Sequence, residues 1–178
     1  MNKRKTLGIL AGAGVTAALA YSLLPVANKN KKSAVKDFEV EKYLGKWYEI
    51  ARLDFYFEKG LDRCTATYSL NKDGSVRVEN VGYDTQRDKW KQSIGKAKFC
   101  GRKTEARLKV SFFGPFYAAY NVIDIDKDYK YALVAGKNTD YLWILSRERN
   151  IPADTKEYFL IKARSMGFPV EKLVWNTH

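Results

Sequence analysis

Few residues of this chain have the chemistry of a catalytic or metal-binding centre. There are two cysteines, Cys64 and Cys100, and one histidine, His178, which is the last residue. A cysteine thiolate is an effective nucleophile where a basic or imidazole neighbour lowers its pKa. The strand-rich part lacks a P-loop, a dinucleotide fingerprint, zinc-ligand spacing and a G-x-S-x-G motif. These residues give no positive sign of an enzyme, and we expect no cofactor and no metal.

The elements that position these residues are predicted to be short β-strands. From residue 45 onward, apolar runs alternate with turn signals such as Asn71-Lys72-Asp73-Gly74, whose Asp-Gly pair is typical of a hairpin. Short connections join every pair except the first. The eight predicted strands are Lys46–Leu53, Cys64–Leu70, Ser75–Tyr83, Lys89–Phe99, Glu105–Phe113, Phe116–Ile125, Tyr129–Gly136 and Tyr141–Arg147.

Eight consecutive antiparallel strands favour a closed barrel, because closure removes exposed sheet edges. A barrel of this size has room inside for side chains or for one small ligand. In one strand Val76, Val78 and Asn80 alternate with Arg77 and Glu79, so both faces carry large or polar residues. Such a mixture favours a cavity with a few polar anchors over a purely aliphatic core. Alternation alone leaves open which face points inward.

One helix is predicted after the last strand. Asp154 and Glu157, which follow Pro152, resemble an acidic helix cap. Apolar residues recur at helical spacing until Gly167 ends the run. We expect about three turns packed outside the barrel, and then a short extended segment, Val170–Trp175.

The first 36 residues differ in kind from the rest. Residues 6–27 carry no charge, and seven basic residues flank them. This pattern is typical of an export signal, and ~20 apolar residues also suffice to span a bilayer. Residues 18–20 fit a signal cleavage site, yet the apolar run continues to Val26. We therefore predict an N-terminal signal or membrane anchor at residues 1–36, with the anchor favoured, and one domain at 37–178. No cysteine precedes Cys64, so no N-terminal cysteine is available for lipid attachment.

Net charge and aromatic content limit the classes of partner that we expect this chain to bind. The formal charge of +12 falls to +5 in residues 37–178, where 25 basic residues face 20 acidic ones without clustering into a stripe. We therefore expect no nucleic-acid partner. The chain has 25 aromatic residues, nearly all beyond residue 37, and many must be buried or line a cavity.

Three motifs resemble the signature regions of the lipocalin family, in the family's order. They are Gly45-Lys46-Trp47-Tyr48, residues 128–136 (DYKYALVAG) and residues 141–147 (YLWILSR) before the helix. The segments WYEIAR, TATYSL, VSFFGPFY and YNVI are similar to those of bacterial outer-membrane lipocalins and the apolipoprotein D group. The resemblance covers residues 38–176. It implies an all-β fold, an eight-stranded antiparallel up-and-down barrel or calyx, closed at one end, with the C-terminal helix packed outside.

The resemblance assigns a structural role to Gly45, Trp47 and Arg147. In the family, the arginine of the last strand lies across the tryptophan of the first at the closed base. A cation over an indole ring contributes roughly 0.5–2 kcal/mol. We therefore expect Trp47→Ala to destabilise the barrel rather than to abolish binding selectively.

The resemblance places function at the open end. The connection from Asp54 to Arg63 would overhang the mouth, where Phe55, Tyr56 and Phe57 are predicted to form a lid or a hydrophobic lip, unless they only pack on the rim. For the ligand cavity, strand position and residue type select Tyr68, Asn80, Phe112, Tyr117 and Trp143, each of which is equally compatible with plain core.

By this resemblance, the protein binds, stores or transports a hydrophobic ligand, a fatty acid or a lysophospholipid, and supports maintenance of the cell-envelope membranes. The mild positive charge would suit a carboxylate or phosphate head. Its other expected partners are the membrane, through the N-terminus, and a second copy of the chain in a homodimer. We expect it in the envelope, membrane-anchored or exported to the periplasm or outer membrane.

Two alternatives stay open. Some lipocalins are enzymes, and the prostaglandin-synthase type uses a cysteine ten residues before a turn glycine, as Cys64 lies before Gly74. The other is a partner-binding envelope module whose cavity is filled by its own side chains. In the calyx, Cys64 would lie near the mouth and Cys100 at the base, ~20 Å or more apart. A disulfide needs Cα atoms within ~7 Å, so we expect two unpaired thiols.

Overall fold

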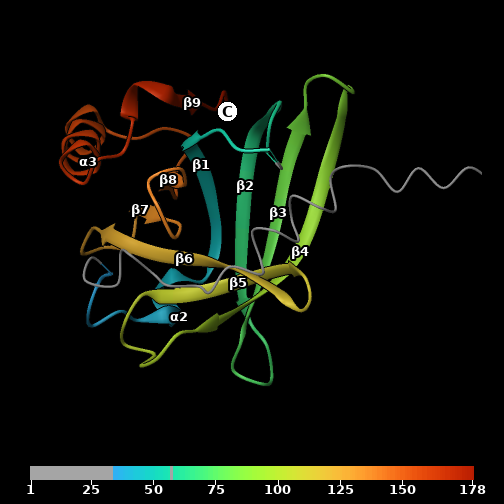
Figure 1. The fold of residues 1–178 in the computed structure, drawn as a ribbon, viewed down its shortest axis with the longest axis vertical. Helices are drawn as coiled ribbons and strands as arrows, with labels where there is room; N and C mark the ends of the chain where they lie inside the picture. The colour runs from blue at the N-terminus through green and yellow to red at the C-terminus, as the bar shows by residue number, and fades with distance from the viewer. Residues whose placement is uncertain (1–33, 57) are drawn as a thin grey trace, which may run out of the picture.

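The computed structural model describes residues 34–56 and 58–178, which form one closed antiparallel β-sheet (Figure 1). The sheet order is β2-β3-β4-β5-β6-β7-β8-β1, and β1 closes the ring by pairing with β2. The predicted eight-stranded barrel is therefore confirmed. Its strands are β1 Gly45–Leu53, β2 Leu61–Leu70, β3 Val76–Asp84, β4 Lys89–Phe99, β5 Arg107–Phe113, β6 Phe116–Ile125, β7 Tyr131–Ala135 and β8 Leu142–Ser146.

The differences from the predicted strands lie at their ends. β2 begins at Leu61, three residues before the predicted start, because the chain already pairs with β3 there. The predicted extended segment 170–175 is a strand only in its second half: a short 3-10 helix, η1 Val170–Lys172, precedes β9 Leu173–Trp175. β9 pairs with the C-terminal end of β1, residues 51–53, so a ninth strand extends the sheet outside the ring.

Helix α3, Ala153–Ser165, packs on the outside of the barrel as predicted (Figure 1). Its buried residues Phe159 and Ala163 belong to a hydrophobic cluster with outward side chains of β1, β7 and β8. The predicted acidic cap is wrong, because the N-cap residue is Pro152 and no side chain caps the helix. Asp154 lies instead in the first turn, where its carboxylate interacts favourably with the positive end of the helix dipole.

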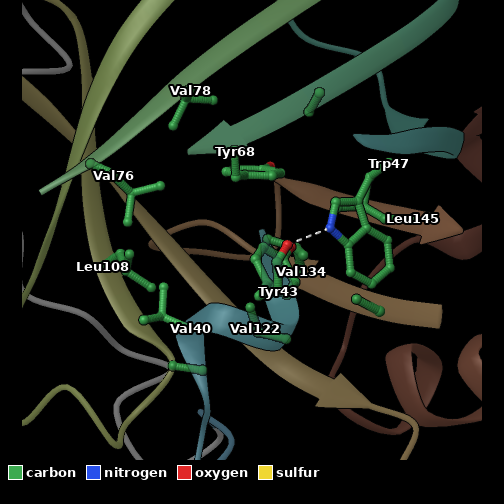
Figure 2. Packing of buried hydrophobic residues seen from close by; sticks show 14 of the residues in the cluster. Val40, Tyr43, Trp47, Tyr68, Val76, Val78, Leu108, Val122, Val134 and Leu145 are labelled. Carbon is green, nitrogen blue, oxygen red and sulfur yellow. Dashed lines mark hydrogen bonds between the residues drawn. The ribbon is translucent and has the colours of Figure 1, made fainter. Parts of the chain in front are cut away.

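The closed end is covered by α2, Val40–Tyr43, which runs beneath the inner hydrophobic cluster (Figures 1 and 2). Trp47 is fully buried there, and its indole nitrogen donates a hydrogen bond of 2.8 Å to the carbonyl oxygen of Tyr43 (Figure 2). Arg147 lies over the same indole, and Gly45 adopts a φ of +91° beside it. The three residues predicted for the base therefore meet there.

A β-bulge interrupts the alternation of β1. The register with β8 shifts between Glu49 and Ala51, and both Ile50 and Ala51 belong to the outer cluster beneath α3. Because two successive residues face outward, Glu49 and Arg52 both face the barrel interior, where they contact each other. This bulge places charged groups in the wall of the barrel.

The uncharged core of the predicted signal or anchor, residues 6–27, lies outside the described part of the chain. Within residues 34–56 and 58–178, no helix is long and apolar enough to cross a bilayer. The chain joins the barrel just before the predicted domain: the Val35 nitrogen donates a hydrogen bond to the Val122 oxygen, and the Val35 oxygen accepts one from Ala106.

Candidate functional site

A cavity of about 760 Å³ occupies the interior of the barrel. Since consecutive strands are antiparallel, the β1–β2, β3–β4, β5–β6 and β7–β8 connections all lie at the end opposite α2, and this end forms the mouth. Aliphatic side chains line the deeper part, among them Val76, Val78, Ala97, Leu108 and Val110. The volume falls within the range of ~300–1,000 Å³ that is usual for small-molecule sites.

All five residues predicted for the cavity line it: Tyr68, Asn80, Phe112, Tyr117 and Trp143. Their contacts differ. The amide oxygen of Asn80 is buried and has no hydrogen-bond partner in the described part of the chain, so it is available to a donor from a ligand. The Tyr117 ring lies 4.9 Å from the ammonium nitrogen of Lys109. Whether each residue touches a ligand remains a prediction.

The predicted mouth residues lie on the β1–β2 connection. Phe55 lines the cavity and packs edge-on against Tyr141 and Trp143, with ring centroids 5.4 Å and 5.7 Å away. Tyr56 also reaches the cavity, although 67% of its surface is exposed. Phe57 lies outside the described residues. Phe55, Tyr141 and Trp143 form an aromatic cluster at the mouth, which we call the mouth cluster.

Three tyrosines form the floor of the cavity. The Tyr120 hydroxyl lies 2.6 Å from that of Tyr43 and 2.7 Å from that of Tyr68. Burial raises the pKa of all three hydroxyls above the usual value, so they remain protonated. Tyr120 was absent from the predicted site because alternation in β6 left open whether Tyr117 or Tyr120 faces inward, and Tyr43 was absent because it lies in α2, before the first predicted strand.

A charged cluster, centred on Arg52, occupies the wall near the mouth. Arg52 is 1% exposed, and its guanidinium lies 2.8 Å from Glu49, 3.3 Å from Asp54 and 3.7 Å from Glu58. It also donates hydrogen bonds to the backbone oxygens of Glu58 and Leu61, which ties the β1–β2 connection to the wall. The sequence prediction missed this cluster because the bulge reverses the alternation of β1.

Glu58 links the charged cluster to the mouth cluster. Its carboxylate accepts a hydrogen bond of 3.1 Å from the indole nitrogen of Trp143. Burial and the nearby carboxylate of Glu49 raise the pKa of Glu58 to about 8, although the Trp143 hydrogen bond and Arg52 oppose that rise. Glu58 therefore changes its charge just above neutral pH.

The two cysteines are free thiols. Cys64 lines the cavity and is buried, and burial together with the carboxylate of Glu49 raises the pKa of its thiol, while Arg52 opposes that rise. Cys100 follows β4 and is half-buried, and burial raises its pKa too. The ring of His178 contacts Tyr48 and the Glu49 backbone oxygen. Cys64 thus lies in surroundings that disfavour a thiolate.

Across residues 34–56 and 58–178, no group of three or more histidine, cysteine, aspartate or glutamate residues is placed to hold a metal ion. The site that the structure does assemble is therefore an apolar chamber with a tyrosine floor, a charged wall and an aromatic mouth. Such a chamber is suited to binding an elongated apolar molecule with a polar end.

Comparison with known proteins gives consistent results. A family profile described as a lipocalin-like domain matches residues 38–178. The outer membrane lipoprotein Blc of Citrobacter freundii is 49% identical over 166 residues, covering 90% of this chain and 94% of that protein. Its counterpart in Escherichia coli K12 is 53% identical over 143 residues, covering 80% and 81%. Insecticyanin of the tobacco hornworm Manduca sexta superposes with a TM-score of 0.67 at 21% identity, over 82% of this chain and 84% of that one, and has the same fold.

Proposed function

Since this chain belongs to the lipocalin family, we propose that its barrel binds one fatty acid or lysophospholipid and stores or transports it without catalysis. The observation that carries the proposal is the cavity of about 760 Å³ with aliphatic walls and one open end. An acyl chain would lie along Val76, Val78 and Leu108, and its head group would remain at the mouth. Burial of apolar chain surface supplies the driving force.

We further propose that the protein works in the cell envelope. The similar proteins of Citrobacter freundii and Escherichia coli are named outer membrane lipoproteins, and the basic and apolar N-terminal segment of this chain suits export or anchoring. There the ligand would be drawn from membranes under repair. A homodimer remains a prediction, which light scattering of the purified protein tests.

The two alternatives receive less support. An enzyme using Cys64 needs a thiolate, whereas burial and Glu49 favour the protonated thiol. A partner-binding module with a filled barrel is difficult to reconcile with the empty volume between the strands. The carrier is therefore the function that the geometry supports best.

The experiment that tests the carrier is native mass spectrometry of protein purified from its own host, before and after organic extraction. We expect a stoichiometric fatty acid or lysophospholipid that extraction removes. Val78→Trp, which fills the cavity, should reduce the bound fraction, whereas the same substitution at Val174, on the exposed face of β9, should not. Protein that is purified without a bound lipid and that also does not bind fluorescent fatty-acid probes would overturn the proposal.

A further inference from the structure

We propose that the mouth of the cavity contains a site for a cationic amine head group, formed by the carboxylate of Glu58 and the rings of the mouth cluster. The inference rests on the proposed function, because it specifies the head group of the chain-bearing ligand. It also differs from the sequence-based expectation that a carboxylate or phosphate is the group recognised.

The charge balance of the wall is the first argument. Within the described part of the chain, Arg52 is the cation that forms ion pairs with the carboxylates of the charged cluster. These are the carboxylates of Glu49, Asp54 and Glu58. Glu49 and Glu58 line the cavity, whereas Arg52 is almost fully covered and directs two hydrogen bonds to backbone oxygens. When Glu58 is ionised, a ligand at this wall therefore meets three carboxylates and one guanidinium, an excess of negative charge that a second cation would balance.

The mouth cluster is the second argument. Phe55 meets Trp143 at an interplanar angle of 85° and Tyr141 at 65°, and the edge of Trp143 donates a hydrogen bond to the Glu58 carboxylate, so the carboxylate lies beside a cluster of rings of different orientation. The face of an aromatic ring attracts a cation, and aromatic side chains combined with a carboxylate are suited to ammonium groups. An anionic head group would be repelled at the same position.

The far wall leaves room for the rest of a zwitterionic head group. Lys89 and Lys91 of β4 line the cavity there, and Lys91 lies 2.6 Å from Asp84. A phosphate in the same head group would lie on this side, while the amine would lie beside Glu58. The site thus selects lipids whose head group carries an amine.

Ligand binding at this site is coupled to pH. The groups that face Glu58 are Glu49 and Arg52 from β1, Asp54 from the connection, Cys64 from β2 and Trp143 from β8. A bound ammonium group favours the ionised form of Glu58, so binding releases its proton below about pH 8. Affinity for an amine should rise as pH increases toward this value.

The test uses three probes with the same chain: tetradecylamine, tetradecanol and myristate, each displacing a fluorescent fatty acid from the full domain. In Glu58→Gln, we expect affinity for tetradecylamine to fall about tenfold, because a hydrogen-bonded ion pair is lost. Affinity for tetradecanol should stay unchanged. Asp140→Asn is the matched control, since Asp140 lies on the β7–β8 connection at the same end and is not part of the cavity lining.

The outcomes separate the two proposals. If Glu58→Gln weakens all three probes alike, or none of them, the head-group site is wrong while the carrier stands. If none of the probes binds the wild type, the carrier fails as well. A measurement on the wild type avoids dependence on the variant's folding: affinity for tetradecylamine should rise between pH 6 and pH 8 and that for tetradecanol should not, and equal pH profiles would overturn the site.

Discussion

The guanidinium carbon of Arg147 lies 3.9 Å from the centre of the Trp47 ring, and two of its nitrogens donate 2.8 Å hydrogen bonds to the carbonyl oxygens of Lys46 and Lys42. One side chain directly after β8 thus holds the first strand and α2 together at the closed end. The nearest part of the cavity is separated from this contact by the tyrosine floor. The pair is therefore positioned to support the barrel and not the ligand.

Substitution at this pair should affect stability and leave ligand affinity nearly unchanged. We expect Arg147→Lys to lower the free energy of unfolding by about 1–3 kcal/mol, since lysine lacks the planar fork that serves both carbonyls. Trp47→Ala should cost about 3–5 kcal/mol through loss of a buried ring. Urea unfolding measures both, with Arg149→Lys on the exposed turn after β8 as control. A normal stability combined with lost fatty-acid binding would contradict the assignment.

The second prediction concerns the mouth. Phe55→Ala removes one wall of the mouth cluster, and we expect affinity for a fluorescent fatty acid to fall about fivefold to tenfold through lost apolar contact. Tyr56→Ala should have a smaller effect, because most of the Tyr56 ring is already exposed. Fluorescence titration compares the two variants. Equal losses would argue against Phe55 as part of the ligand site.

The pH dependence of stability reports on Glu58. Its pKa is near 4.5 in the unfolded chain and about 8 in the fold, so folding favours the protonated carboxyl. This contribution to stability is fully present below pH 4.5 and is lost as the pH rises through 8. Urea unfolding at pH 5 and pH 9 should show wild type losing stability relative to Glu58→Gln, which cannot ionise. If the free energies of unfolding of the two proteins change with pH in parallel, Glu58 does not make this contribution.

The cysteines give a fourth prediction. Cys64 is buried beside Glu49, whereas Cys100 is only half-buried, so iodoacetamide at pH 8 should modify Cys100 first and Cys64 mainly on unfolding. Peptide mapping by mass spectrometry measures both rates. Cys64→Ser should retain ligand binding. Rapid alkylation of Cys64 in the folded protein would instead revive the enzyme alternative.

The sequence was sufficient to predict the barrel, because turn signals such as Asp73-Gly74 separate its strands and three ordered motifs carry the family resemblance. It also located residues that the structure brings together at the base and around the cavity. Strand ends were less accurate, since β2 begins before Cys64 by pairing with β3, and pairing depends on contacts distant in the chain.

The charged wall could not be predicted from alternation. Glu49 and Arg52 are three residues apart, which places them on opposite faces of a regular strand, and only the shift between Glu49 and Ala51 brings both inside. The adjacent apolar residues Ile50 and Ala51 were the one available signal. Glu58 was missed for another reason: its burial depends on Trp143, which is 85 residues away.

The bulge in β1 also has a consequence for how this chain tolerates insertions and deletions. The bulge shifts the in-and-out alternation of β1 by one residue, because residues after Ala51 project on the face opposite to that expected from the residues before Glu49. Deletion of Ile50 would place Ala51 directly after Glu49 and restore regular alternation, with Arg52 still facing the interior and Leu53 still facing outward. The charged wall of the calyx should therefore tolerate the loss of one residue at this bulge, whereas loss of both Ile50 and Ala51 would turn Arg52 outward and Leu53 into the cavity.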